Sequence, residues 1–151
     1  MVLPRAAAAV LDEWGWQVDA VVEDRARFWG GGDGVDFWAV PVVPKGGREC
    51  APASGVCIAA VPEHARADAH CVWGERNLRK ASWRLGPLLP GNAAIYGIVP
   101  GDVTGARVTI GDLSAPVDAR DGVIGGTLPF PYREGADVHV ELLRRAHSAS
   151  K

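Results

Sequence analysis

The chain has 151 residues and lacks both a long apolar run and an excess of charge of either sign. No window approaches the roughly 18 consecutive apolar residues that a membrane-spanning helix needs. The apolar run at 6–11 is also shorter than the roughly 7 to 15 residues of a signal-peptide core. Sixteen Lys and Arg stand against eighteen Asp and Glu, for a formal net charge of -2. We therefore expect no membrane span, and the charge balance favours no nucleic-acid partner.

The sequence also lacks the motifs of familiar enzyme and cofactor sites. The glycines at 30–34 lead into a strand pattern, whereas a phosphate-binding loop opens a helix. No Gly-x-Ser-x-Gly turn and no catalytic-cysteine motif occurs. His64, His70 and Cys71 lie close in sequence, but no second pair of ligands accompanies them as in zinc patterns. We expect no metal and no cofactor, and the sequence assigns no catalytic residue.

A cluster of cations surrounds Trp83, with Arg76, Arg79, Lys80 and Arg84 as its members. Cations beside an aromatic ring are a feature of proteins that bind single-stranded nucleic acid. One aromatic residue is little for such a surface, and acidic residues are spread along the whole chain. The pattern is more typical of a solvated face.

Turn-forming residues are abundant, because 19 glycines and 11 prolines make up about a fifth of the chain. Short β-rich runs recur between these turns every 8 to 12 residues or so, which predicts an all-β sandwich or a partly closed barrel. The length fits a single domain over 1–151, with a helix at about 4–13, a β domain at 26–143 and a polar tail at 144–151. Residues 14–22 fit helical and strand spacing equally well. The predicted strands are 27–30, 35–43, 56–61, 69–73, 81–85, 94–99, 107–110, 115–117, 122–128 and 137–143.

The first two predicted strands form a hairpin around Asp33-Gly34, a pair that readily adopts positive φ. Alternation along the second strand places Phe37 and Trp38 on opposite faces. Pro41 lies in the same strand and donates no hydrogen bond, so we expect this strand at a sheet edge.

Six tryptophans are an unusual number for this length. Tryptophan is seldom fully buried and is enriched among interface anchors. We predict Trp29, Trp38 and Trp83 as candidate binding residues. Either Trp29 or Trp38 should be exposed or covered only by the N-terminal helix, through Leu11 and Trp14.

Two parts of the chain resemble small actinobacterial β domains of unknown function from secreted or membrane-anchored proteins. The first part is the strand 55–59, Gly-Val-Cys-Ile-Ala, followed by a second cysteine at Cys71. The second is the turn pattern at 95–100, Ile-Tyr-Gly-Ile-Val-Pro, with the later segments 115–117 and 120–123. The resemblance covers about 55–130 and implies a location in the cell envelope. It implies no activity.

Three cysteines leave the disulfide pattern open. Cys57 and Cys71 lie in apolar runs on either side of a polar turn, so a hairpin would bring them together. The pattern of the resembling domains agrees with this pairing and has no equivalent of Cys50. We predict the bridge Cys57–Cys71 with Cys50 left over, while pairings of Cys50 with either partner stay open.

These observations predict a non-catalytic binding or structural module that is extracellular or in the cell envelope. Its partner would be a protein or another cell-envelope component. The alternative is a small enzyme or a small-molecule-binding protein with a pocket between the sheet and the N-terminal helix.

Overall fold

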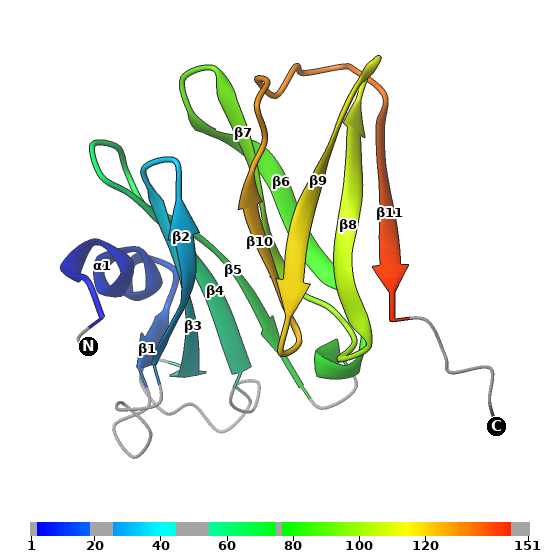
Figure 1. Cartoon of the computed structure of the whole chain (residues 1–151). Helices are drawn as coiled ribbons and strands as arrows, with labels where there is room; N and C mark the ends of the chain where they lie inside the picture. The colour runs from blue at the N-terminus through cyan, green and yellow to red at the C-terminus, as the bar shows by residue number, and fades with distance from the viewer. Residues whose placement is uncertain (1–2, 19–25, 45–54, 75–76, 146–151) are drawn as a thin grey trace, which may run out of the picture.

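The computed structural model describes residues 3–18, 26–44, 55–74 and 77–145, and it arranges them in three layers (Figure 1). Helix α1 (Arg5–Glu13) forms one outer layer. A five-stranded antiparallel sheet, the first sheet, lies in the middle. A six-stranded antiparallel sheet, the second sheet, forms the other outer layer. The prediction of an all-β sandwich or partly closed barrel with one N-terminal helix is confirmed.

Helix α1 matches the predicted helix closely. Pro4 has the extended φ and ψ of an N-cap, and the alanines that follow are the best helix formers. The helix ends before Gly15, which has a φ of +83°. It buries Ala7, Val10 and Leu11 against the first sheet. No helix in the described stretches is long and apolar enough to cross a membrane.

The first sheet has the strand order β1-β3-β4-β5, and β2 also pairs with β3. Strands β1 and β2 therefore share one edge of β3. Because α1 covers one face of this sheet and the second sheet covers the other, β4 is apolar along its whole length instead of alternating. The strands of the first sheet are β1 (Trp16–Val18), β2 (Arg27–Gly32), β3 (Val35–Pro44), β4 (Gly55–Pro62) and β5 (Asp68–Trp73).

The expectation that Pro41 marks an edge strand is wrong, because β3 lies in the interior of the first sheet. Among the described residues, β3 pairs with β2 up to Ala39 and with β1 from Val42. Val56 of β4 lies opposite Pro41. Strands on both sides of β3 therefore place Pro41 within the sheet.

The predicted hairpin is confirmed: β2 and β3 are joined by Asp33 and Gly34 with φ values of 55° and 80°. Positive φ at both central residues is typical of a type I′ turn. The register shifts between Phe28 and Gly30, so Trp29 has no partner in β3 and forms a β-bulge. Such bulges redirect side chains, and this one turns Trp29 toward the second sheet.

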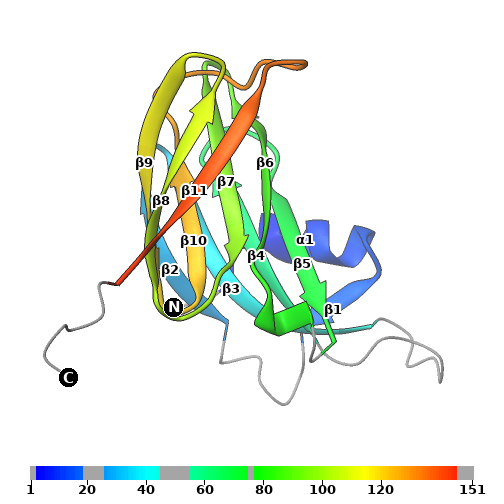
Figure 2. The ribbon, with the colours of Figure 1, turned by 90° about the vertical axis from the view of Figure 1, so that its right-hand side faces the viewer.

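The second sheet has the strand order β11-β8-β9-β10-β7-β6 and curls into a half-barrel (Figure 2). A short 3₁₀ helix, η2 (Asn77–Arg79), precedes it. Each of the ten predicted strands overlaps an observed strand, and β1 lies in the segment that the sequence left undecided. The strands are β6 (Ser82–Leu89), β7 (Asn92–Ile98), β8 (Val103–Ile110), β9 (Leu113–Arg120), β10 (Val123–Thr127) and β11 (Val138–Arg144).

Three apolar clusters fill the layers. The first lies between α1 and the first sheet and includes Leu11 and Trp38. The second lies between the two sheets and includes Phe37 from β3 and Tyr96 from β7. The third fills the inside of the half-barrel and includes Ile95. Phe37 and Trp38 thus face opposite sides of β3, as alternation predicted.

The predicted disulfide Cys57–Cys71 is present. The two cysteines are direct partners in the β4–β5 ladder, with their Cα atoms 4.0 Å apart. Neighbouring strands therefore place both sulfurs on the face that α1 covers. Cys50 lies outside the described residues.

Candidate functional site: a slot lined by glycines

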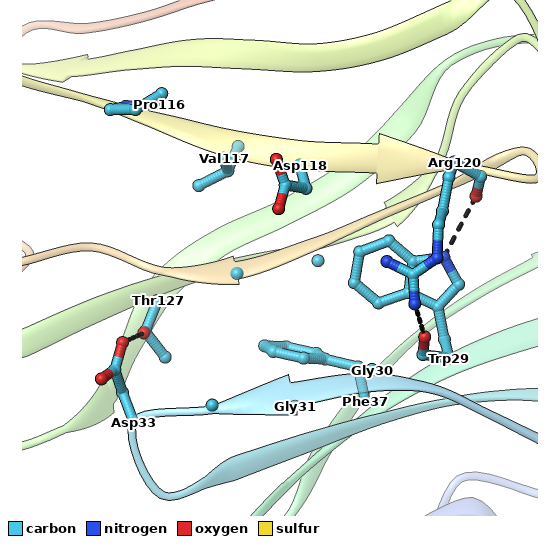
Figure 3. A pocket seen from close by; sticks show the side chains of 13 residues that line it. Trp29, Gly30, Gly31, Asp33, Phe37, Pro116, Val117, Asp118, Arg120 and Thr127 are labelled. Carbon is cyan, nitrogen blue, oxygen red and sulfur yellow. Dashed lines mark hydrogen bonds between the residues drawn. The ribbon is translucent and has the colours of Figure 1, made fainter.

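A cavity of about 460 Å³ lies where β2 of the first sheet approaches β9 and β10 of the second (Figure 3). We call it the glycine slot, because its lining includes Gly30, Gly31 and Gly32 of β2 and Gly125 and Gly126 of β10. Its volume falls within the range of about 300 to 1,000 Å³ that is usual for ligand pockets.

The slot exists because neither neighbouring strand continues its ladder there. In the described part of the chain, β2 pairs only with β3. Strand β10 pairs with β9 only at Val123 and Ile124, and then the two strands separate. Pro116 of β9 lies beyond this point and lines the slot. Backbone groups along the slot therefore have fewer strand partners than in the rest of the sheets.

One end of the slot is closed by a reciprocal contact between Trp29 and Arg120, which we call the Trp29 clamp (Figure 3). The indole Nε1 of Trp29 donates to the backbone oxygen of Arg120 at 3.0 Å. The Arg120 guanidinium in turn donates to the backbone oxygen of Trp29 and lies 4.3 Å from the centre of its ring. This cation–π contact and the two hydrogen bonds join the first sheet to the second.

The other end of the slot is polar. Thr127 of β10 donates to the carboxylate of Asp33 in the β2–β3 turn at 3.1 Å. Between the two ends, Asp118 of β9 points its carboxylate toward the slot (Figure 3). Within the described stretches of chain, Asp118 has no hydrogen-bond or ion-pair partner. It is therefore the acceptor group that is open to a ligand.

Close packing around the slot explains two of its glycines. A Cβ on Gly125 would lie 3.0 Å from the Trp29 ring and 3.2 Å from the Phe37 ring. A Cβ on Gly30 would lie 3.1 Å from the Arg120 guanidinium. Gly32 differs, because nothing lies within 4 Å of the position of its Cβ. This open space is part of the slot, and a side chain at residue 32 would occupy it.

The three tryptophans predicted as binding residues do not come together. Trp29 closes the slot and is half-buried. Trp38 lies under α1 with 3% of its surface exposed, and its Nε1 has no hydrogen-bond partner among the described residues. Trp83 packs against the cluster inside the half-barrel. Of the three, Trp29 is the one that lines the glycine slot.

Sequence reasoning missed the other polar residues of the slot, among them Asp118, Arg120 and Thr127. The pair Gly125-Gly126 inside a predicted strand was a usable signal, because glycine within a strand often marks a close approach of backbone or ligand. The run 30–34 also contributes more than its hairpin turn. Its first three glycines form one wall of the slot.

The two sheets also meet on the opposite side of the fold, at β5 and β6. We call this junction the β5–β6 seam, and side chains close it. His70 Nε2 lies 2.7 Å from Ser82 Oγ, and Arg84 Nε lies 3.1 Å from the carboxylate of Asp68. Tyr96 of β7 also donates to Asp68.

The seam shifts the pKa values of two of its groups. Burial lowers the pKa of His70, and nearby Arg84 lowers it further while Asp68 opposes this. Burial and the bond to Asp68 raise the pKa of Tyr96. His70 is therefore neutral and Tyr96 protonated at neutral pH.

A second cavity, of about 350 Å³, lies between α1 and this seam, where the alternative prediction expected a pocket. Val10 and Trp14 of the helix region line it, together with Arg66 and Arg84. Trp14 is 42% exposed, so it does not cover the sheet as predicted, whereas Leu11 does. Both arginines already have carboxylate partners in Glu13 and Asp68.

The residues considered for a metal site are occupied otherwise. Cys71 is in the disulfide, and His70 contacts Ser82. His64 is exposed beside Glu63. Among the residues that the structure describes, no three His, Cys, Asp or Glu side chains are placed to hold a metal ion.

Comparison of the chain with protein-family models, with curated proteins and with solved structures found no match. The resemblance to actinobacterial envelope domains therefore stays a prediction.

Proposed function

We propose that the protein is a non-catalytic binding module that works outside the cytoplasm and holds a protein or cell-envelope partner in the glycine slot. The observation that carries this proposal is the slot itself. It is a cavity of about 460 Å³ with both ends closed by contacts between the sheets. The carboxylate of Asp118, which has no partner among the described residues, points inward.

Rigid surroundings support a binding role for this cavity. The Trp29 clamp and the bond between Thr127 and Asp33 hold the two walls at a set separation. A cavity with walls held apart in this way costs little ordering free energy when a ligand enters. The phenyl ring of Phe37 forms part of the lining, so the slot offers both apolar and polar contacts.

The disulfide supports a location outside the cytoplasm. Disulfides form and persist in oxidising compartments, and they are rare in the reducing cytosol. The disulfide Cys57–Cys71 lies in the middle layer of the fold, where it links β4 to β5. Such a bond suits a module that has to stay folded in a secreted or envelope environment.

A matched pair of variants tests the proposal. Gly32→Leu should fill the slot without a clash, because nothing lies within 4 Å of that Cβ position. Gly86→Leu is the control, since Gly86 also lies in a strand with open space at its Cβ but does not line the slot. Circular dichroism should show both variants folded like the natural protein.

Biolayer interferometry then measures how the natural protein and the two variants bind the solubilised cell-envelope fraction of the source cell. The components of this fraction are separated and tested in the same way. We expect the natural protein and Gly86→Leu to bind equally, and Gly32→Leu to lose at least tenfold in affinity. Equal binding by all three proteins, or binding by none, would refute the slot as the binding site.

A second candidate function is favoured by the cavity between α1 and the β5–β6 seam. Trp14, Arg66 and Arg84 line it, so a small amphipathic acid would fit where its carboxylate takes the place of Glu13 or Asp68 on one of the arginines. The variant Trp14→Ala separates the two functions, because it removes a wall of this cavity and leaves the glycine slot untouched. Loss of small-acid binding in Trp14→Ala with retention in Gly32→Leu would favour this candidate.

A further inference from the structure

We infer that the glycine slot takes a short extended peptide segment, which pairs with the backbone of Gly31 and places a Lys or Arg side chain on Asp118. This inference rests on the proposed function and names the chemistry of the partner. It follows from the direction of the backbone groups in β2, from the shape of the slot and from its charges.

The antiparallel register determines which backbone groups of β2 face the slot. Gly32 and Val35 flank the two-residue turn, so they form a hydrogen-bonded pair. The next pair, Gly31 and Asp36, is then of the non-hydrogen-bonded kind. The N–H and C=O of Gly31 therefore point away from β3, toward the edge of β2 that has no partner among the described strands.

Along the slot, this edge carries none of the side chains that normally prevent strand addition. Exposed edges are usually blunted by lysine, proline or an inward charge. Strand β2 instead carries three glycines in a row where it lines the slot, and its bulge at Trp29 lies at the end of the cavity. Strand β2 itself therefore presents no side chain to an added peptide along Gly30, Gly31 and Gly32, and the Arg120 guanidinium lies beside Gly30 at the closed end.

The closed ends limit the peptide to a short segment. Arg120 already occupies the backbone oxygen of Trp29, so pairing along β2 stops at that residue. At the other end, the bond between Thr127 and Asp33 spans the gap between the sheets. Only the central stretch of β2 is left, which offers the single donor and acceptor pair of Gly31.

Charge in the slot selects a cation. Its ionisable lining residues are Asp33, Asp118 and Arg120. The Arg120 guanidinium lies on the Trp29 ring, and Asp33 accepts from Thr127. Asp118, across the slot from Gly31, is the lining carboxylate without a partner in the part of the chain that the structure describes (Figure 3). A peptide paired with Gly31 can direct one side chain across the slot, and a Lys or Arg there forms a charge-assisted hydrogen bond.

The test uses a phage-displayed library of random heptapeptides, selected on the natural protein and counter-selected on Gly32→Leu. We expect the recovered peptides to share one Lys or Arg. A synthetic peptide from this set is then titrated with ¹⁵N-labelled protein. The amide of Gly31 should shift and become protected from hydrogen exchange, as expected for a newly paired strand edge.

The role of Asp118 is measured with a double-mutant cycle. Asp118→Asn should weaken binding of the peptide by about fivefold at low salt, as for a partly exposed ion pair. It should leave unchanged the binding of an analogue with norleucine in place of the cationic residue. Asp112→Asn is the matched control, because Asp112 is exposed in the neighbouring β8–β9 turn and does not line the slot.

The outcomes separate this inference from the proposed function. Slot-dependent binding of envelope components without slot-dependent peptides would overturn the peptide inference alone. Recovered peptides without a shared cation, or without protection of the Gly31 amide, would overturn it as well. Failure of both the envelope assay and the peptide selection would overturn the proposed function too.

Discussion

Pro116 lies in a strand with neighbours on both sides, yet it removes no needed hydrogen bond. It pairs with Arg107 of β8 on one side and lies beyond the last β9–β10 pair on the other. The missing N–H therefore coincides with a gap in the sheet. That gap belongs to the glycine slot.

The tryptophans show what can be predicted at the scale of single residues. Alternation along 35–43 was sufficient to place Phe37 and Trp38 on opposite faces, because the period of a strand is 2. The position of Trp29 depends on a bulge, which shifts the register by one residue between Phe28 and Gly30. Nothing in the local sequence fixes such a shift before the partner strand is known. The contact of Trp29 with Arg120, 91 residues away, was for that reason not predictable.

The disulfide gives a prediction for the stability of the fold. Replacing both Cys57 and Cys71 by alanine removes a bridge that closes a sequence separation of 14 residues. In the chain-entropy model this costs about 3 kcal/mol of unfolding free energy. Urea unfolding monitored by circular dichroism measures the loss. Adding a reductant should destabilise the natural protein and leave the double variant unchanged; equal sensitivity of both would contradict the prediction.

At the scale of elements, the positions of the strands in the sequence were more predictable than the pairing between strands. Turns rich in glycine, proline and aspartate separate the strands in sequence, and this spacing was enough to locate them. The partners of each strand depend on long-range packing, so the strand order was not predictable. Pro41 illustrates the difference: the proline was correctly placed in a strand, while its interior position was not foreseen.

Helix α1 should be essential for stability through its buried face. Leu11 is 1% exposed and packs in the cluster that also holds Trp38. Leu11→Ala should lower the free energy of unfolding by about 3 kcal/mol, from lost burial and the cavity left behind. Trp14→Ala is the control and should cost much less, because Trp14 is 42% exposed. Urea unfolding curves of the two variants decide this, and equal costs would argue against a packing role for the helix.

The β5–β6 seam should make stability depend on pH through His70. The pKa of His70 is lowered in the folded protein, so the unfolded chain binds the proton more tightly. The stabilisation is therefore complete above the ordinary pKa of about 6.5, and it is lost as the pH falls below that value. Around the ring, Asp68 favours the proton, Arg84 opposes it and Ser82 contacts Nε2.

His70→Gln should flatten the dependence of unfolding free energy on pH between 7.5 and 5, which denaturant unfolding at several pH values measures. His139→Gln is the control, because His139 lies exposed on β11. A pH dependence that is the same in His70→Gln and in the natural protein would show that the seam does not titrate in this range.

At the scale of the whole molecule, the two sheets meet along two seams of different character. The β5–β6 seam is closed by the contacts of His70 with Ser82 and of Asp68 with Arg84 and Tyr96. The opposite seam, at β2, is closed only at its ends and leaves the glycine slot between them. The slot is therefore a property of how the layers are assembled. The sequence predicted the layers but not their relative placement.

The shared core predicts that both sheets unfold together, as a single domain would. Phe37 of the first sheet and Tyr96 of the second lie in one buried cluster, with ring centres 6.4 Å apart. Separating the sheets would expose this cluster, so the cost of opening falls on both at once.

Two tryptophans allow the unfolding of each sheet to be followed separately. Trp38 reports on the first sheet and Trp83 on the second. Their ¹⁹F resonances in protein labelled with 5-fluorotryptophan, assigned from Trp38→Phe and Trp83→Phe, should disappear at the same urea concentration. Tyr96→Phe, which removes the bond to Asp68 and keeps the ring, should move both midpoints downward together. Two separate midpoints in either protein would show that the sheets unfold independently and that the single-domain prediction is wrong.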